Sequence, residues 1–424
     1  MNYQEALEYI HGVNWTFCKP GLERISELCR GLGNPEKKLK FVHVAGTNGK
    51  GSFCSMLESV LRAAGYKTGL YTSPFVKVFG ERMRVMGENI SDGVLADITA
   101  RVRPVADAMA DKPTEFELIT AIAFEYFYES GCDVVVLEAG MGGRLDSTNV
   151  IESPLLSVIT GIALDHTDYL GNTVEKIAHE KAGIIKPGYP VFYGGEDDTA
   201  RGVIKKRAAE LNSSYYDVDY GNIANSSFSL LGTTFDYKGH KNVKINLLGE
   251  YQSRNATAVI RATEILREGG LNISESALYQ GLEAARWPAR FEIIRHDPMV
   301  IFDGAHNPQG ISSAAQSIKR YFGNRRVLIL SGVLRDKDYE FIAGKLAEVA
   351  KSAFTITPDS PRALAAEDYA RTLISHGVPA TPYPSIKEAL CAAIKAAKES
   401  GDALICLGSL YTYCDVTDSL DKIV

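Results

Sequence analysis

A short glycine-rich loop between a predicted strand and a predicted helix limits the folds open to this chain more than any other feature. The loop reads Gly46-Thr47-Asn48-Gly49-Lys50-Gly51-Ser52. The mostly apolar residues 41–45 precede it and predict a short strand, while apolar residues with helical spacing follow it over 53–64. Glycine lets the backbone approach an anion, and a helix start offers N–H groups and a positive dipole end. The pattern therefore predicts a phosphate site with Lys50 at the outer phosphates. The alternative is a glycine-rich turn with a surface lysine.

The loop departs in two places from the strict phosphate-loop pattern. Val44 stands where the pattern has glycine, and Gly51 separates Lys50 from the next hydroxyl residue. The magnesium-binding hydroxyl of the standard motif therefore cannot be assigned from spacing alone.

Strands and helices alternate along much of the chain, which predicts an α/β fold with a mostly parallel sheet. The next predicted strands are 68–72, 133–137 and 156–160, with helices over 117–128 and 173–185. Residues 190–247 break this rhythm, and 228–237 predict antiparallel structure. Helices resume over 252–285, and four short apolar strands follow near residues 300, 327, 354 and 403. We therefore expect two domains, residues 1–296 and 299–424.

Composition narrows the function classes. The 424 residues carry a net charge of −6, which gives no basic footprint for nucleic acid. The seven cysteines form no Cys-x-x-Cys pair, so neither a disulfide framework nor a structural zinc site is expected. No signal peptide and no apolar run of about 18–20 residues is present, so we expect a cytoplasmic protein without a membrane segment.

Two polar residues follow predicted buried strands. Glu138 ends the strand Asp133-Val-Val-Val-Leu, at the carboxyl end where parallel sheets bind ligands. It is placed like the acid that holds magnesium in phosphate-loop enzymes, although a salt-bridged or capping carboxylate is the alternative. His166 follows the strand at 156–160, and is either a second metal ligand or an ordinary hydrogen-bonded histidine.

Lys181 lies on the apolar face of a predicted helix. Asn172 and Glu175 resemble a capping box at its start, and Val174 and Ile177 share the face of Lys181. A buried ammonium is unfavourable unless it is paired or chemically altered. The lysine is therefore directed at phosphate, converted to a metal-binding carbamate, or extended along the surface with its amine in water.

Seven further motifs, taken in order with the glycine loop, identify a family. The chain closely resembles the folylpolyglutamate synthases, including bifunctional dihydrofolate synthases, of the Mur ligase superfamily. The variant glycine loop is itself that family's pattern. The resemblance runs nearly end to end and rests on His43–Ser52, Tyr71–Phe75, Glu138–Asn149, Leu164–His166, Lys181–Lys186, Trp287–Arg290, Asp303–Pro308 and Gly408–Tyr411.

The resemblance implies an N-terminal ATPase domain, a C-terminal Rossmann-like domain and an active site in the cleft between them. It implies that ATP binds the loop Gly46–Ser52, Asn255 and Arg290. Two magnesium ions would be held by Ser73, Glu138, His166 and a carbamylated Lys181. Asp303 and His306 would contact nucleotide and glutamate. The residues implied near the folate or glutamate substrate are Phe75, Arg82, Arg144 and Ser409.

The implied reaction is ATP-dependent ligation of L-glutamate to a reduced folate, or to dihydropteroate, through an acyl phosphate. Lys50 and Lys181 would stabilise charge, and Asp303 or His306 would take the proton of the glutamate amine. Family resemblance favours a monomer. The alternatives are a Mur-type ligase for a cell-wall precursor, a phosphate-loop ATPase switch that makes no amide, and a non-catalytic binding module.

Overall fold

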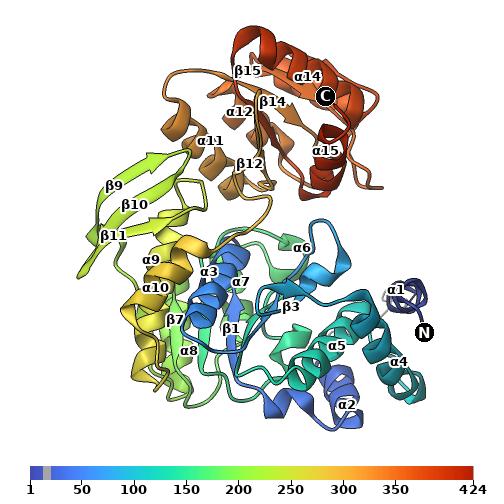
Figure 1. The fold of residues 1–424 in the computed structure, drawn as a ribbon, viewed down its shortest axis with the longest axis vertical. Helices are drawn as coiled ribbons and strands as arrows, with labels where there is room; N and C mark the ends of the chain where they lie inside the picture. Colours follow the sequence, from blue (N-terminus) through green and yellow to red (C-terminus); the bar gives the residue numbers. More distant parts are fainter. Residues whose placement is uncertain (13–20, 424) are drawn as a thin grey trace. The chain divides into compact units, whose positions relative to one another are not determined.

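The computed structural model describes residues 1–12 and 21–423. The chain forms two compact units (Figure 1). The first comprises Met1–Asn222 and Asn255–Ala285, and the second Ile223–Arg254 and Arg286–Val424. The division into functional domains at 1–296 and 299–424 stays a prediction. Cys18 lies outside the described residues.

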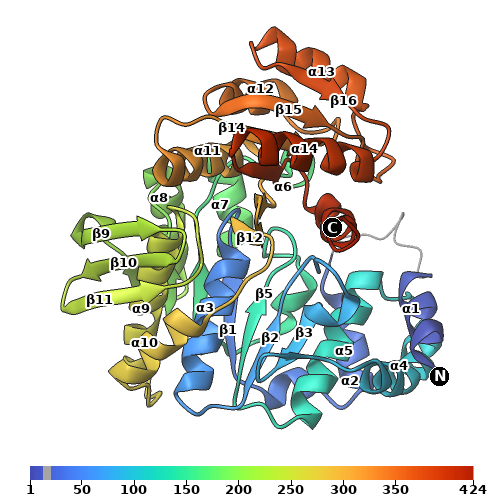
Figure 2. The same cartoon turned by 45° about the horizontal axis from the view of Figure 1, so that its top comes forward.

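The first unit is built on an eight-stranded sheet with the order β4-β3-β2-β5-β1-β6-β7-β8. Pairing is parallel from β2 to β8, and β3 and β4 add an antiparallel edge. Figure 2 shows β1, β2, β3 and β5 side by side. The predicted mostly parallel sheet is confirmed. Its strands are β1 Phe41–Ala45, β2 Thr68–Tyr71, β3 Met83–Val85, β4 Glu88–Asn89, β5 Val134–Glu138, β6 Leu156–Ile159, β7 Val191–Tyr193 and β8 Tyr215–Asp217.

Helices cover this sheet. One hydrophobic cluster joins α1, α2, α4 and α5 to β1, β2 and β5, and another joins α7 and α8 to β6 and β7. α10 packs so closely on α3 that a Cβ at Gly281 would collide with the backbone of Val60. The helices are α1 Tyr3–His11, α2 Glu23–Gly31, α3 Lys50–Ala63, α4 Asp92–Ala108, α5 Glu115–Glu129, α6 Thr167–Leu170, α7 Val174–Ala182, α8 Asp198–Glu210, α9 Gln252–Glu268 and α10 Glu275–Ala284. Four 3-10 turns accompany them, η1 Pro35–Lys38, η2 Phe79–Arg82, η3 Ser147–Val150 and η4 Tyr220–Asn222.

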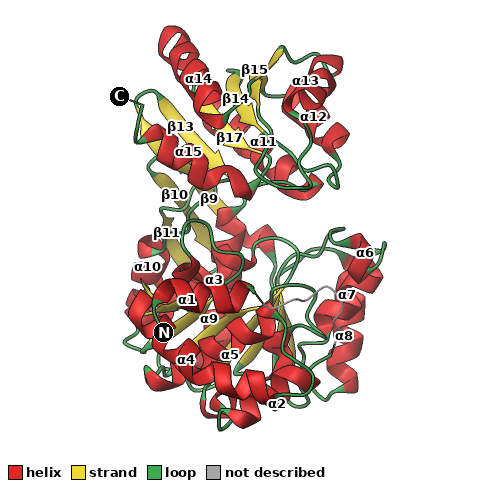
Figure 3. Ribbon diagram, turned by 90° about the vertical axis from the view of Figure 1, so that its right-hand side faces the viewer, coloured by secondary structure: helices red, strands yellow, loops and turns green. Residues whose placement is uncertain are grey.

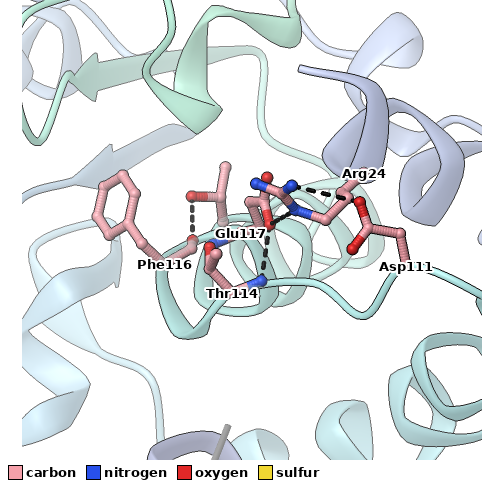
Figure 4. A network of polar contacts seen from close by, with 6 residues as sticks. Arg24, Asp111, Thr114, Phe116 and Glu117 are labelled. Carbon is pink, nitrogen blue, oxygen red and sulfur yellow. Dashed lines mark hydrogen bonds and ion pairs between the residues drawn. The ribbon is translucent and has the colours of Figure 1, made fainter. Parts of the chain in front are cut away.

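A buried ion pair joins α2 to α5 (Figure 4). Arg24 Nε donates to Glu117 Oε2 over 2.9 Å, and the same oxygen accepts the backbone N–H of Thr114 at 2.7 Å. Arg24 Nη1 also lies 3.4 Å from Asp111 Oδ2. Glu117 therefore caps α5 and neutralises a buried guanidinium at once, which is the condition under which burying two charges is tolerated.

The second unit contains a six-stranded sheet with the order β12-β13-β17-β14-β15-β16. All neighbours are parallel except β12 and β13. α11, α12 and α13 share one core on the sheet, whereas α14 packs against α15, β14 and β15 (Figure 3). This is the predicted second α/β unit. Its strands are β12 Glu292–His296, β13 Met299–Asp303, β14 Val327–Ser331, β15 Ala350–Thr355, β16 Ala380–Pro382 and β17 Leu404–Leu407. Its helices are α11 Pro308–Phe322, α12 Tyr339–Ala347, α13 Ala366–Ser375, α14 Ile386–Ser400 and α15 Tyr413–Leu420, with the 3-10 turn η5 Leu410–Thr412.

The break predicted over residues 190–247 is placed too early. β7, α8 and β8 continue the parallel pattern to Asp217, and only then does an antiparallel sheet begin. β7 and β8 have three residues each, too few for a periodic signal in the sequence. The antiparallel sheet itself is confirmed. It consists of β9 Ile223–Ser229, β10 Gly232–Tyr237 and β11 His240–Ile245, which pair in the order β11-β10-β9.

The six cysteines in the described part of the chain are free thiols, and four of them are buried. Within residues 1–12 and 21–423, none of the helices combines the length and apolar character that crossing a membrane requires.

Candidate active site

The glycine loop joins β1 to α3 at the carboxyl end of the strand. Gly46 and Gly49 have φ values of 153° and 84°, a region that strains any residue with a side chain. A Cβ at Gly46 would overlap the hydroxyl of Thr160, and one at Gly49 would lie 2.9 Å from Asn255 Oδ1. The predicted strand, loop and helix are therefore confirmed, and both positions leave room only for glycine. Asn255 lies against the loop, and its contact with the nucleotide stays a prediction.

The segment after β6 braces this loop. Thr47 N donates to the carbonyl of Gly161 at 2.8 Å, and the Thr47 hydroxyl bonds both the carbonyl and the N–H of Ala163 at 3.1 Å. Thr160 Oγ1 donates to the carbonyl of Asn48 at 2.8 Å. These bonds hold the loop to the segment that follows β6.

Lys50, Glu138 and Ser73 meet where three parallel strands end. Lys50 Nζ lies 3.9 Å from Glu138 Oε1, and Ser73 N donates to Glu138 Oε2 at 3.3 Å. Glu138 is buried, and β5 lies between β1 and β2, so the registers of these strands bring the three residues together. Glu138 is thus partly a salt-bridged carboxylate, and oxygen atoms of Ser73 and Glu138 are available as donors for a hard cation.

Lys181 is buried beside the glycine loop. Only 4% of the residue is exposed, and Nζ donates to the carbonyl of Gly46 at 2.8 Å. Burial, together with the charge of Lys50, lowers the pKa of Lys181 to about 7, and Asp165 and Asp146 oppose part of this shift. The alternative of an amine extended into water is therefore wrong.

The start of the helix that carries Lys181 differs from the prediction. Thr173 caps α7, because its hydroxyl accepts the N–H of Lys176 at 3.2 Å. Asn172 instead accepts the side-chain amine of Lys176 at 3.4 Å. The predicted capping box of Asn172 and Glu175 is wrong by one residue because two neighbouring residues with capping side chains compete for the role.

His166 precedes α6 in an exposed, left-handed conformation with φ 49°. The backbone N–H of His166 donates to Asp165 Oδ1 at 3.0 Å. Across the described ranges, no three His, Cys, Asp or Glu side chains form a metal-binding group. The metal set Ser73, Glu138, His166 and Lys181 therefore stays a prediction.

In the second unit, Asp303 ends β13 and is buried. Its carboxylate accepts hydrogen bonds from Tyr251 Oη at 3.1 Å, Phe291 N at 3.0 Å and Ala305 N at 2.8 Å. Burial raises the pKa of Asp303, while the charge of Arg290 and these hydrogen bonds oppose the shift. Asp303 thus gathers three segments of the unit around the strand end and holds Arg290 nearby.

His306 and Ser409 lie at the ends of two adjacent parallel strands, β13 and β17. His306 Nδ1 lies 2.8 Å from the carbonyl oxygen of Gly304, which only accepts, so Nδ1 carries the proton and the lone pair of the neutral ring is on Nε2. Ser409 is buried, and the N–H of the preceding Gly408 donates to Ala305 at 3.0 Å. The two predicted residues are therefore held at one edge of the sheet.

Comparison with known proteins gives this geometry a family. Residues 44–263 match the Mur ligase middle domain, and residues 289–410 match the Mur ligase glutamate ligase domain. A dihydrofolate synthase/folylpolyglutamate synthase of Bacillus subtilis is 38% identical over 430 residues, covering 99% of each chain. A protein of the same name from Escherichia coli is 35% identical and covers 98% of this chain and 94% of its own.

The chain belongs to the folylpolyglutamate synthase and dihydrofolate synthase family of Mur ligases.

Solved structures agree with this assignment. Mycobacterium tuberculosis folylpolyglutamate synthase, complexed with ADP and AMPPCP, has a TM-score of 0.88 and 29% identity and covers 97% of this chain and 98% of its own. Escherichia coli FolC in complex with DHPP and ADP has a TM-score of 0.86 and 32% identity and covers 100% of this chain and 98% of its own. The α/β fold with two domains predicted for this Mur ligase is confirmed.

Two of the predicted folate-side residues of this Mur ligase are in contact. The guanidinium of Arg82 lies 5.1 Å from the ring centre of Phe75 and 5.8 Å from that of Phe79. Arg82 Nε is buried and has no hydrogen-bond partner among the described residues. Arg144, the third predicted residue, is half-exposed and pairs with Glu180 at 2.9 Å.

Sequence reasoning missed a buried relay behind the site. His43 Nε2 bonds the hydroxyl of Thr148 at 2.8 Å, and that hydroxyl lies 2.6 Å from Asp146 Oδ1, to which it donates. Asp146 also accepts the N–H of Met141 at 2.8 Å. His43 lies in the strand before the glycine loop, so the relay ties that strand to the loop after Glu138. The only signal in the sequence is a histidine inside an apolar strand.

Proposed function

We propose that this protein joins L-glutamate to a folate in an ATP-dependent reaction that forms an amide. The observation that carries the proposal is the buried Lys181 amine at the glycine loop, close to Lys50 and Asp146, within a chain related end to end to folylpolyglutamate and dihydrofolate synthases. A lysine buried at the glycine loop suits a site that binds carboxylates and phosphates, because nearby anions offset the unfavourable burial of its charge.

The reaction proceeds in two steps. The γ-phosphoryl group of ATP passes to a carboxylate of the folate, giving ADP and an acyl phosphate. The neutral amine of glutamate then attacks the acyl carbon, phosphate leaves, and the amide forms. Phosphoryl transfer depends on positioning and charge stabilisation, which Lys50 and the start of α3 supply at the loop Gly46–Ser52. Asn255 and Arg290 contact the nucleotide in this proposal.

Magnesium fits the residues present. The side chains of Ser73 and Glu138 carry oxygen atoms, and the Ser73 backbone N–H donates to Glu138 at 3.3 Å, which keeps the two residues together. His166 follows the segment that braces the glycine loop. When bound, magnesium ions neutralise the charge of the phosphates. The amine of Lys181 suits carbamylation, because its neutral form adds to CO2, loses a proton and becomes an anionic oxygen donor. Its lowered pKa makes that neutral form abundant near pH 7.

We propose that His306, rather than Asp303, is the base that removes a proton from the glutamate amine. The neutral His306 ring carries its lone pair on Nε2, because Nδ1 donates to Gly304. The oxygens of Asp303 already accept three hydrogen bonds that organise the strand end. Ser409, at the same edge of the sheet as His306, contacts the amino acid. Phe75, Arg82 and Arg144 contact the folate.

We assign ATP binding to residues 1–296 and amino-acid binding to residues 299–424, in a cytoplasmic monomer. The acceptor is a reduced folate, dihydropteroate or both. The test is ADP release measured with and without glutamate, with tetrahydrofolate and dihydropteroate compared as acceptors. Dependence on both glutamate and an acceptor supports the proposal and identifies the acceptor. ATP hydrolysis at the same rate without them would instead indicate a phosphate-loop switch.

A further inference from the structure

The loop over residues 139–149 and the end of α7 are packed backbone against backbone. A Cβ at Gly143 would lie 3.0 Å from the carbonyl oxygen of Glu180 and 3.1 Å from that of Lys181. A Cβ at Gly183 would collide with the side chain of Arg144. The two segments are in direct contact at both glycines, so a small displacement of one must move the other.

Asn149 fastens this contact. Its Nδ2 donates to the carbonyl oxygens of Arg144 at 3.0 Å and Gly183 at 3.1 Å. The backbone carbonyl of Asn149 accepts a hydrogen bond from the Lys186 amine at 2.8 Å. The backbone N–H of Arg144 donates to the carbonyl of Glu180 at 2.8 Å. Gly183 is the C-terminal cap of α7, where carbonyl groups lack helical partners, so the Asn149 side chain supplies a donor to one of these acceptors.

The Asn149 side chain donates both of these hydrogen bonds while its own oxygen atom remains unpaired in the described part of the chain. The residue is 5% exposed, and its Oδ1 is buried without a hydrogen-bond partner among the described residues. A buried acceptor without a partner destabilises the folded chain, because it has given up its hydrogen bonds to water. An apolar residue would avoid this cost but would leave the two carbonyl oxygens of Arg144 and Gly183 without their donor.

The two fastened segments carry the two central groups of the site. The loop continues directly from Glu138, and Gly183 follows Lys181 by two residues. Lys181 in turn reaches the carbonyl of Gly46 in the glycine loop. A displacement of about 1 Å at such a site reduces rates by roughly 100-fold.

We propose that Asn149 is a positioning residue of the ligase reaction, which holds the helix bearing Lys181 in register with Glu138 and the glycine loop. The proposal rests on the proposed function for its kinetic consequences and on the hydrogen bonds of Asn149 for its structural ones. Asn149 acts through Lys181 and has no contact with substrate in this role.

The kinetic test compares Asn149→Ala with Thr99→Val, which removes an equally buried hydrogen bond, Thr99 Oγ1 to Leu95 at 2.7 Å in α4. In Asn149→Ala, kcat for glutamate-dependent ADP release falls about 10-fold or more, while KM for ATP stays within about 2-fold. Thr99→Val loses stability only. Equal kinetics in the two variants would overturn the inference. If Asn149→Ala fails to fold, Lys186→Met removes one anchor of Asn149 and should lower kcat in the same direction.

A double variant tests whether Asn149 acts through Lys181. In single-turnover measurements, Asn149→Ala added to Lys181→Ala changes the rate by less than about 2-fold, because the group it positions is already gone. A combined effect equal to the product of the single effects would mean that Asn149 has a general structural role, and would refute the inference.

A measurement without catalysis separates this inference from the proposed function. Amide hydrogen exchange in Val174–Ala182 should be faster in Asn149→Ala than in both wild type and Thr99→Val. Unchanged exchange would refute the inference even if the protein is a ligase. A wild-type protein without glutamate-dependent ADP release would refute the proposed function while the exchange result still decides the role of Asn149.

Discussion

The amine of Lys181 donates a 2.8 Å hydrogen bond to the carbonyl oxygen of Gly46, the first residue of the glycine loop. The two residues are 135 positions apart in the chain. This contact joins the phosphate cradle to a lysine whose pKa is lowered to about 7, mainly by burial, and it suggests the first of five tests.

Replacing Lys181 should abolish most of the activity. We expect Lys181→Ala to lower glutamate-dependent ADP release by roughly 100-fold or more, because a preorganised group that stabilises charge is lost. Added bicarbonate or short carboxylates should restore part of the rate by supplying the missing anionic oxygens. The exposed Lys206→Ala in α8 is the control and should behave as wild type. A fully active Lys181→Ala enzyme would eliminate the carbamate proposal.

Gly49 should be required for ATP binding for two reasons, its backbone conformation and the lack of space for a side chain beside Asn255. Gly49→Ala combines a positive φ of 84° with a Cβ 2.9 Å from Asn255 Oδ1, so KM for ATP should rise about 10-fold or more. Gly65→Ala is a matched control, since its φ is 92° and no atom lies within 4 Å of the new Cβ. That control should lose stability but keep the KM for ATP. A similar KM in both variants would contradict the prediction.

His306 should control the pH dependence of the amide-forming step. If His306 takes the proton of the glutamate amine, His306→Ala should remove the acidic limb of the kcat/KM profile for glutamate and lower the plateau by about 100-fold. The KM for ATP serves as the internal control, because the glycine loop is untouched. A pH–rate profile of unchanged shape in the variant would exclude His306 as the base.

His43 should make the fold sensitive to acid. Burial lowers its pKa to about 3 from an ordinary value of 6.5, so the unfolded chain binds a proton that the folded chain refuses. The contribution of the neutral His43 ring to the free energy of unfolding is fully present above pH 6.5. It decreases as the pH falls toward 3, by up to about 1.4 kcal/mol per pH unit. In urea denaturation between pH 7 and 5, His43→Gln should lose less stability on acidification than wild type.

The exposed His296→Gln in β12 is the control for that experiment and should follow the wild-type pH dependence. The same slope in His43→Gln and wild type would show that the buried ring is not responsible for acid lability.

Glu36 should destabilise the protein at neutral pH. It is buried, its Oε2 has no hydrogen-bond partner among the described residues, and burial raises its pKa. The folded chain therefore holds the proton more tightly, and stability falls as pH rises above 4.5 toward the raised value. Glu36→Gln should increase the free energy of unfolding by about 1–2 kcal/mol at pH 7 and by much less at pH 4.

Glu58 provides the opposite case in the same unit. It is equally buried, but it accepts Thr68 Oγ1 at 2.6 Å and Arg62 Nε at 3.1 Å. Glu58→Gln should therefore destabilise the protein at pH 7, because a buried charged hydrogen bond is weakened. If Glu36→Gln and Glu58→Gln change stability in the same direction, hydrogen-bond satisfaction does not explain the difference.

The sequence determined the local elements around the site. A strand, four residues with small or polar side chains and a helix beginning at Lys50 are specified by nearby residues, because apolar spacing and glycine act within a few positions. The same reasoning placed Glu138 and Asp303 at strand ends, where β5 and β13 do end. It failed for β7 and β8, whose three residues carry no period, and for the cap of α7, where Asn172 and Thr173 compete.

Only the tertiary structure decided which of these residues meet. Sheet order places β5 between β1 and β2, and this brings Glu138 to Lys50 and Ser73. The bond from Lys181 to Gly46 and the bond from Asn149 to Gly183 join residues that are 135 and 34 positions apart. Such contacts depend on how whole strands and helices pack, and the spacing of residues along one element contains no information about its neighbours.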